Sequence, residues 1–274
     1  MKKQLPTFEL GLYMLVSKDG NLQAGSALTL KERLNEILQA AKLADEMGLD
    51  VFGIGGYTCN EYAIASPSVI ISHITSFIEL INATTADTVR LYELLEAQLE
   101  SLSKSVKVET NIDSAAQAGK LGVNLALAVL GGDPEQFKRI VDAYRQEAAA
   151  AAVPASQQQV TVTGHMYLAE SDALAERQFY PYYRNYWREV HAQREGSNDM
   201  TPEQFHLMST PDSALLVGSP ELVIEKILQQ HELYGHTRLL ARVDIGGLPF
   251  KYIAKNIEYL AERIAPVIRK ELCQ

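Results

Sequence analysis

Short apolar runs alternate with amphipathic helical segments along most of the chain, and this alternation limits the fold more than any other feature. Strands that alternate with helices predict parallel pairing through right-handed crossovers, and therefore an α/β fold. Seven apolar runs are expected to be strands, spanning residues 8–16, 49–55, 77–83, 106–111, 124–130, 159–169 and 238–245.

Capping residues mark where the intervening helices begin and end. Thr29 with Glu32 forms a capping box, and Gly48 ends the same helix. Asp133 and Pro134 supply an N-cap and a first-turn proline for a later helix. Because no glycine-rich phosphate motif follows the first strand, a seven-stranded relative of the (β/α)₈ barrel is favoured over a doubly wound open sheet. In such barrels the chemistry lies where strands end and loops begin.

Composition narrows the class of protein further. The 274 residues are 47% hydrophobic and 22% charged, and no linker divides them, so residues 1–274 are expected to form a single barrel domain. A net charge of −9 argues against nucleic acid or an anionic membrane as partner. Glu9 interrupts the first apolar run, which argues against a signal peptide, and no run is long enough to span a membrane. Cys59 and Cys273 form no disulfide framework, so a reducing cytoplasm is expected.

Several long blocks resemble the luciferase-like flavin-dependent monooxygenases. The first two βα units of that family are similar to RLNEILQAAKLADEMGLDVFGIG with ASPSVI shortly after it. Later blocks, in family order, are AGKLGVNLALAVLGGDPEQFKRIVDAYRQ and LLVGSPELVIEKILQQHELYGHTRLLARVDIGGLP. The resemblance implies a TIM-barrel-like fold, an FMN cofactor and a small organic substrate. It also implies a dimer, either with itself or with a full-length relative.

Two departures from the family pattern bear on function. Typical members of the closest subgroup carry Glu-His-His after the second strand, and here Gly56, Tyr57 and Thr58 occupy those positions. In addition, VKVETN leads directly into DSAAQAGKLG, where the family places a further βα unit. One missing unit is consistent with seven strands. A similar shortening occurs in the non-fluorescent flavoprotein related to bacterial luciferase, an analogy of architecture only.

The resemblance also suggests which residues line the site. Asn82, Ala83 and Thr84, after the third expected strand, would lie against the flavin ring, while Tyr57 and His165 are the catalytic candidates at the mouth. A tyrosine with an ordinary pKa near 10 is a poor base at neutral pH. A lone strand histidine is more often a hydrogen-bonded structural group than a base. The remaining histidines show no metal-ligand spacing, so no metal is expected.

Turns that follow strands are candidates for the FMN phosphate, because free N–H groups at a helix start bind anions. Each has an ordinary alternative: Asp133 and Asp113 can cap the helices that follow, and the carboxylate of Asp244 would repel a phosphate. The candidate turns are Gly131 with Gly132, Gly246 with Gly247, and the group of Thr110, Asn111 and Ser114.

Two functions remain open. The first is a shortened luciferase-like flavoprotein that binds FMN with weakened or absent monooxygenase chemistry. The second is a barrel that has lost its cofactor and serves as a structural or regulatory subunit. The aromatic stretch FYPYYRNYW, residues 179–187, is compatible with a cofactor cover, a partner surface or plain helix packing.

Overall fold

A computed structural model describes residues 8–15, 30–55, 107–109, 111–191 and 199–272. The strands of these residues pair in parallel throughout, in the order β2-β1-β7-β5-β4-β3, with β6 paired to β5. This confirms the expected α/β fold with a parallel sheet. The strands are β1 (Glu9–Leu15), β2 (Val51–Gly55), β3 (Lys107–Glu109), β4 (Leu125–Val129), β5 (Val160–Leu168), β6 (Leu216–Gly218) and β7 (Arg238–Arg242).

The first and last described strands meet at the middle of the sheet. β1 pairs with β7 from Glu9 opposite Arg238 to Leu12 opposite Ala241. β5 has two successive partners on its way to its carboxyl end, because its residues 161–165 pair with β7 and its residues 166–168 with β6. Every residue of β4 is buried, as its uninterrupted apolar run predicts.

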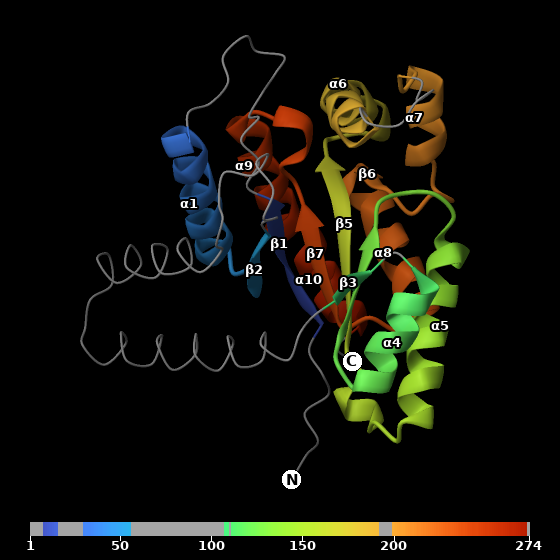
Figure 1. The fold of residues 1–274 in the computed structure, drawn as a ribbon. Coiled ribbons are helices and arrows are strands. Elements are labelled where there is room, and N and C mark those ends of the chain that lie inside the picture. The colour runs from blue at the N-terminus through green and yellow to red at the C-terminus, as the bar shows by residue number, and fades with distance from the viewer. Residues whose placement is uncertain (1–7, 16–29, 56–106, 110, 192–198, 273–274) are drawn as a thin grey trace, which may run out of the picture.

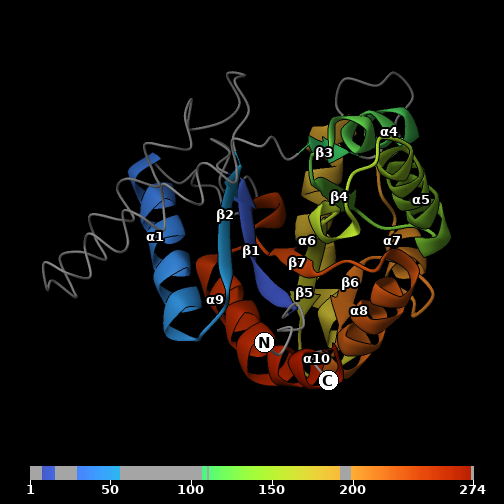
Figure 2. The same ribbon diagram turned by 90° about the horizontal axis from the view of Figure 1, so that it is seen from below.

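Helices surround the sheet on its outer side. Seen from below, they follow one another around the strands from α1 through α9, α10 and α8 to α5 and α4 (Figure 2). Their bounds are α1 (Leu30–Glu46), α4 (Ile112–Leu121), α5 (Pro134–Ala150), α8 (Pro220–Tyr234), α9 (Phe250–Tyr259) and α10 (Ala265–Leu272), with a π-helical turn at Leu260–Ile264.

α6 (Asp172–His191) has a different place from these helices. It lies across the carboxyl ends of β5 and β7, with α7 (Pro202–Ser209) beside it (Figure 1). Gly246, in the turn after β7, lies directly beneath α6: a Cβ built there would come within 1.8 Å of the Tyr182 carbonyl oxygen. The helix therefore closes over the end of the sheet at which function is expected.

Within the described residues, one observed strand was not expected, and one expected strand cannot be compared. The expected strand at 77–83 lies outside the described residues, and β6 was not expected because three residues are too few to show a period. The predicted total of seven strands in a closed barrel therefore stays a prediction.

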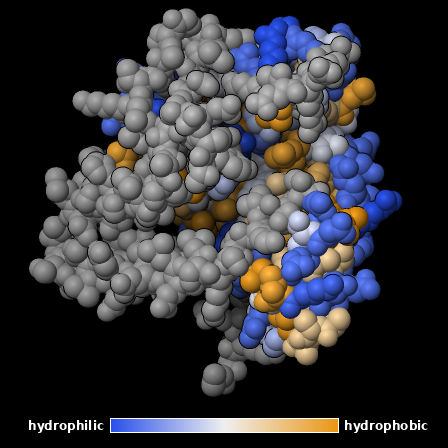
Figure 3. Space-filling model, in the orientation of Figure 1, coloured by the Kyte–Doolittle hydropathy of each residue, from blue (hydrophilic) through white to orange (hydrophobic). Residues whose placement is uncertain are grey.

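Within the described residues, no helix combines the length and apolarity that a membrane crossing requires. The described part of the face in Figure 3 is mainly hydrophilic over α4, α5 and α7, with separate hydrophobic spots. Leu207 on α7 and Leu121 on α4 are the most exposed large apolar side chains of the described residues, at 70% and 61%.

Candidate functional site at the carboxyl ends of β5 and β7

Charged and polar side chains meet where β7 ends beside the second half of β5. His165 is paired in register with Arg242, and the Arg242 Nη1 atom lies 3.5 Å from His165 Nε2. Two residues further on, the Asp244 side chain is fully buried, with its Oδ1 atom 3.6 Å from Arg242 Nε. The cluster lies at the edge of the sheet where barrel enzymes place their chemistry.

A buried ion pair ties this cluster to the start of α1. Arg33 donates from Nη2 to Asp244 Oδ2 at 2.8 Å, and from Nη1 to Glu36 Oε2 at 3.1 Å. The Arg33 side chain is only 8% exposed. A buried pair of this kind stabilises little by itself, but removal of one partner leaves an uncompensated charge. The pair therefore fixes the orientation of Asp244.

His165 is enclosed by aromatic rings. The rings of Tyr183 and Tyr186 meet its imidazole edge-on, at centroid distances of 5.7 and 4.7 Å, and its exposed fraction is zero. Burial, followed by the positive charge of Arg242, holds the pKa of His165 well below its usual 6.5. The imidazole is therefore neutral at physiological pH. Its Nδ1 atom has no hydrogen-bond partner.

Helix α6 is held over this cluster by hydrogen bonds to the backbone after β4 and after β7. The Tyr183 hydroxyl donates to the Leu130 carbonyl, just after β4, at 3.1 Å. Asn185 donates from Nδ2 to the Gly246 carbonyl, after β7, at 3.3 Å. The Arg242 guanidinium carbon lies 5.4 Å from the centre of the Tyr186 ring, within cation–π range. The aromatic stretch at 179–187 therefore packs against the site in addition to its own neighbours.

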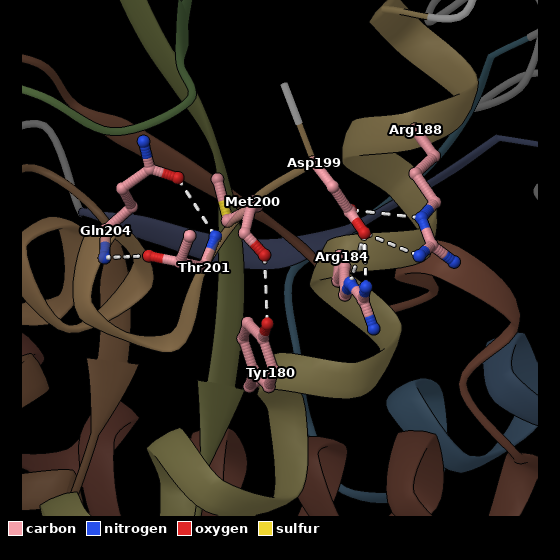
Figure 4. A network of polar contacts seen from close by, with 7 residues as sticks. All are labelled: Tyr180, Arg184, Arg188, Asp199, Met200, Thr201 and Gln204. Carbon is pink, nitrogen blue, oxygen red and sulfur yellow. Dashed lines mark hydrogen bonds and ion pairs between the residues drawn. The ribbon is translucent and has the colours of Figure 1, made fainter. Parts of the chain in front are cut away.

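A second set of contacts joins α6 to residues 199–204 (Figure 4). Asp199 accepts hydrogen bonds from Arg184 and Arg188, which lie one helical turn apart on α6, and these bonds hold the pKa of Asp199 well below its usual range. The Tyr180 hydroxyl donates to the Met200 carbonyl at 2.9 Å. Thr201 then opens α7 with a reciprocal capping box. These contacts position α7 against α6.

The candidate phosphate turns differ in their surroundings. Gly131 and Gly132 both have positive φ, and a Cβ at Gly132 would meet only the flexible end of Gln136. The Asp133 side chain accepts from the Glu135 N–H, so it acts as the expected N-cap. A Cβ at Gly131 would lie 2.9 Å from the Met208 methyl group, and the Asp133 carboxylate beside the turn opposes an anion.

At the start of α4, the cap differs from the one expected. Asn111, and not Asp113, is the N-cap, because its Oδ1 atom accepts from the Asp113 N–H at 2.7 Å. An extended φ and ψ place Asn111 in the usual capping conformation, which Asp113 cannot adopt because it is already the second residue of the helix. Ser114 is partly buried in the first turn of α4.

The third candidate turn, Gly246 with Gly247, is covered by helix α6. The backbone of α6 at Tyr182 and Tyr186 lies against Gly246, and the Gly246 carbonyl already accepts from Asn185. A phosphate could reach this backbone only if α6 moved. A phosphate role for Gly131 with Gly132, for Asn111 with Ser114 and for Gly246 with Gly247 stays a prediction, and at Gly246 the backbone of α6 lies against the turn.

Several predicted site residues lie outside the described residues, and their roles stay predictions. They are Tyr57, with its neighbours Gly56 and Thr58, together with Asn82, Ala83, Thr84 and Thr110. Sequence reasoning missed Arg33 and Arg242 and treated Asp244 only as a source of repulsion. The available signal was the pair of charges that flank buried Val243 at the end of an apolar strand.

Other possible sites contribute less. A groove of about 410 Å³ opens beside the end of β4, lined by Ile112, Ala128, Leu130, Gln136, Phe137, Arg139 and Ile140. It does not include His165 or Arg242. Among the described residues, no three His, Cys, Asp or Glu side chains are grouped to hold a metal ion.

Comparison with known proteins defines the class. Residues 110–237 match the model of the luciferase-like monooxygenase family. Monooxygenase RslO1 from Streptomyces bottropensis has a similar fold, with 15% identity, coverage of 94% of this chain and 99% of that chain, and a TM-score of 0.64. So has the apo form of MsnO8, with 17% identity, coverage of 92% and 98%, and a TM-score of 0.61. No curated protein matches by sequence.

A third similar structure was solved with its cofactor. It is the oxygenating constituent of 3,6-diketocamphane monooxygenase from Pseudomonas putida, a type II Baeyer-Villiger monooxygenase in complex with FMN. Its identity is 15%, its TM-score 0.62, and the match covers 95% of this chain and 98% of that chain. The fold is thus that of the luciferase-like TIM-barrel structures. By sequence, the resemblance to the luciferase-like monooxygenase family is carried by residues 110–237.

Proposed function

We propose that this chain is an FMN-binding flavoprotein, built as one shortened seven-stranded barrel, whose monooxygenase chemistry is weakened or lost. The observation that carries the proposal is the buried cluster of His165, Arg242 and Asp244 at the mouth of a luciferase-like fold. Buried charges are costly, and at a strand end in this class of fold they more often serve a ligand than the core. A small organic substrate and a cytoplasmic location are part of the same proposal.

The described residues can hold and shield such a cofactor. The N–H groups after β4, around Gly131 and Gly132, and those at the start of α4, around Asn111 and Ser114, would bind the phosphate. Helix α6, whose Tyr183 and Tyr186 rings pack on His165, would exclude water from the mouth. When bound, reduced FMN supplies the reaction with oxygen, and the protein supplies position and electrostatics. His165 and Tyr57 would line the mouth, with His165 neutral.

Titration of the purified protein with FMN tests this proposal. We expect quenching of flavin fluorescence and a rise in melting temperature, since a ligand that binds only the folded state stabilises it. Gly132→Glu places a second carboxylate beside the proposed phosphate turn and is expected to weaken FMN binding about tenfold or more. Gly48→Glu is the matched control, because Gly48 also has positive φ and has no neighbour within 4 Å of a built Cβ. Wild-type protein that neither quenches flavin nor gains stability contradicts the proposal.

The closed mouth favours a second candidate function. Because α6 fills the space over Gly246 and buries His165, the barrel could serve without a cofactor as a structural or regulatory subunit. Such a subunit is expected to form a homodimer or to pair with a full-length relative. Size-exclusion mass and capture of a purified full-length homologue test this candidate, and a strict monomer that binds FMN tightly contradicts it.

A further inference from the structure

Lys226, in the middle of α8, carries its ammonium group into the interior of the protein. Its exposed fraction is 1%, and its Nζ atom donates to the Leu215 carbonyl at 2.8 Å and to the Ser209 carbonyl at 3.0 Å. Among the residues that the structure describes, no carboxylate forms an ion pair with it. A buried charge that meets only neutral carbonyls is costly, because these replace only part of its hydration.

The charged groups around Lys226 lie on neighbouring segments. Asp172 and Glu176, at the start of α6, and Asp212, before β6, attract the ammonium from beyond ion-pair distance. Asp172 already accepts from the backbone N–H of the α8 N-cap, and Glu176 pairs with His206 of α7. β6 itself carries no charged residue. Burial outweighs these attractions and lowers the pKa of Lys226 to about 8.

The two carbonyls that Lys226 meets lie at the ends of the connection from α7 to β6. Ser209 is the last residue of α7, and Leu215 directly precedes β6. One turn further along α8, Gln230 donates from Nε2 to the Ala214 carbonyl at 2.9 Å. Helix α8 therefore supplies the side-chain donors that hold this connection in place.

The connection and α7 together support the aromatic wall of the mouth. Phe205 on α7 is buried, and its ring centre lies 5.2 Å from that of Tyr183. The Tyr183 ring packs in turn on His165. Residues 202–215, which we call the α7 strap, thus link the ammonium of Lys226 to the side chains that enclose the mouth.

We propose that the α7 strap opens locally, and that the buried ammonium of Lys226 sets how readily it does so. In the open strap water surrounds the ammonium again, so the cost of burial favours opening whenever Lys226 is charged. Loss of the proton removes this cost and favours the closed strap. Opening separates Phe205 from Tyr183 and uncovers one side of the mouth. This inference goes beyond FMN binding and does not depend on it.

Carbon NMR of protein labelled at the lysine Cε atoms measures the charge on Lys226 directly. We expect one lysine signal to titrate near pH 8, and we expect this signal to be absent in Lys226→Met. If every lysine signal titrates near the ordinary 10.5, the proposal is overturned, because the closed strap then imposes no penalty on the charge.

Amide hydrogen exchange at pH 7 and pH 9 measures the opening. Protection factors in the α7 strap are expected to rise about tenfold between these pH values, since the closed strap binds the proton with a pKa of about 8 and the open strap with an ordinary 10.5. At pH 7 they are expected to be lower than those of the buried strand β4, which requires global unfolding to exchange. Protection factors that are level or fall with pH, or that equal those of β4, overturn the proposal.

Lys226→Met removes the charge, and protection of its α7 strap is expected to be independent of pH over this range. Lys226→Gln, which keeps a neutral N–H donor, is expected to behave alike and serves if methionine prevents folding. Lys138→Met is the matched control, since Lys138 lies on α5, is partly exposed and pairs with Asp142; it is expected to keep the tenfold rise. A rise that persists without Lys226, or that is lost without Lys138, overturns the proposal.

Discussion

Among the described glycines, Gly246 is the one at which an added side chain would make the shortest contact. It has a positive φ of 58°, and a Cβ would strike the Tyr182 carbonyl oxygen. Gly246→Ala is therefore expected to lower the free energy of unfolding by about 3 kcal/mol, the left-handed strain plus the cost of overpacking. Urea denaturation followed by circular dichroism measures the change.

The control for this substitution is Gly48→Ala. Gly48 has a similar φ of 73°, but nothing lies within 4 Å of a built Cβ, so only the strain of about 1 kcal/mol remains. Equal losses in the two variants would show that α6 does not press on the turn after β7. The pair of Gly246 and Gly247 was evident in the sequence. That α6 covers it was not evident, because residue type alone carries no information about packing between segments far apart in the chain.

At the scale of elements, α4 and α5 cross in close contact at Gly119. A Cβ at Gly119 would lie 2.2 Å from the Tyr144 carbonyl oxygen and 2.9 Å from the Ala148 nitrogen. Gly119→Ala is expected to force the helices apart and cost about 1–3 kcal/mol of unfolding free energy. Gln117→Ala, an exposed change on the same helix, is expected to be near neutral or slightly stabilising. Thermal melts of both variants compare the two outcomes.

The contacts between α6 and the segment that opens α7 define a second element-scale prediction. Asp199→Asn removes the carboxylate that Arg184 and Arg188 share, so faster amide exchange is expected at residues 199–209. High salt should reduce the difference from wild type, because these side chains are partly exposed. Glu258→Gln breaks a comparable exposed pair with Lys255 on α9 and should leave this segment unchanged. Unaltered amide exchange in Asp199→Asn would refute the role of the contacts between Asp199 and the two arginines.

Most described elements could be predicted from sequence because their signals are local. The helix that opens at Asp133 and the fully apolar β4 follow from caps and from burial on both faces. β6 was not predicted because the three residues of Leu216–Gly218 are too few to show an alternating pattern. The position of α6 was not predicted from the sequence. Its apolar stripe shows that one side of the helix is buried, but not that this side covers the strand ends.

For the molecule as a whole, acid should destabilise the fold before its carboxylates titrate. Burial, followed by the nearby charge of His231, lowers the pKa of His236 from 6.5 to about 3, and the pKa of His165 is lowered well below 6.5. Between these values the unfolded chain binds protons that the folded chain does not. The contribution of the two neutral histidines to the free energy of unfolding is therefore fully present above about pH 6.5. Below that pH it falls by about 1.4 kcal/mol per pH unit for each histidine.

Urea titrations at pH 7.5 and 5.5 measure this loss, which is expected to be about 2–3 kcal/mol for the two histidines together. His236→Phe should reduce the pH dependence by about half, whatever its effect on stability at pH 7.5. A wild-type stability that is level across this range would contradict the burial of both imidazoles as neutral groups.

The pairing of β1 with β7 has a consequence for how the chain acquires its structure. Glu9 and Arg238 are held together although 229 residues separate them. A nascent polypeptide emerging from the ribosome thus exposes its first strand long before the segment that will complete its pairing has been translated. Pairing between strands so far apart in sequence slows folding, and until it occurs the edge of β1 is exposed and available for aggregation. We therefore expect the protein to depend strongly on chaperones during synthesis.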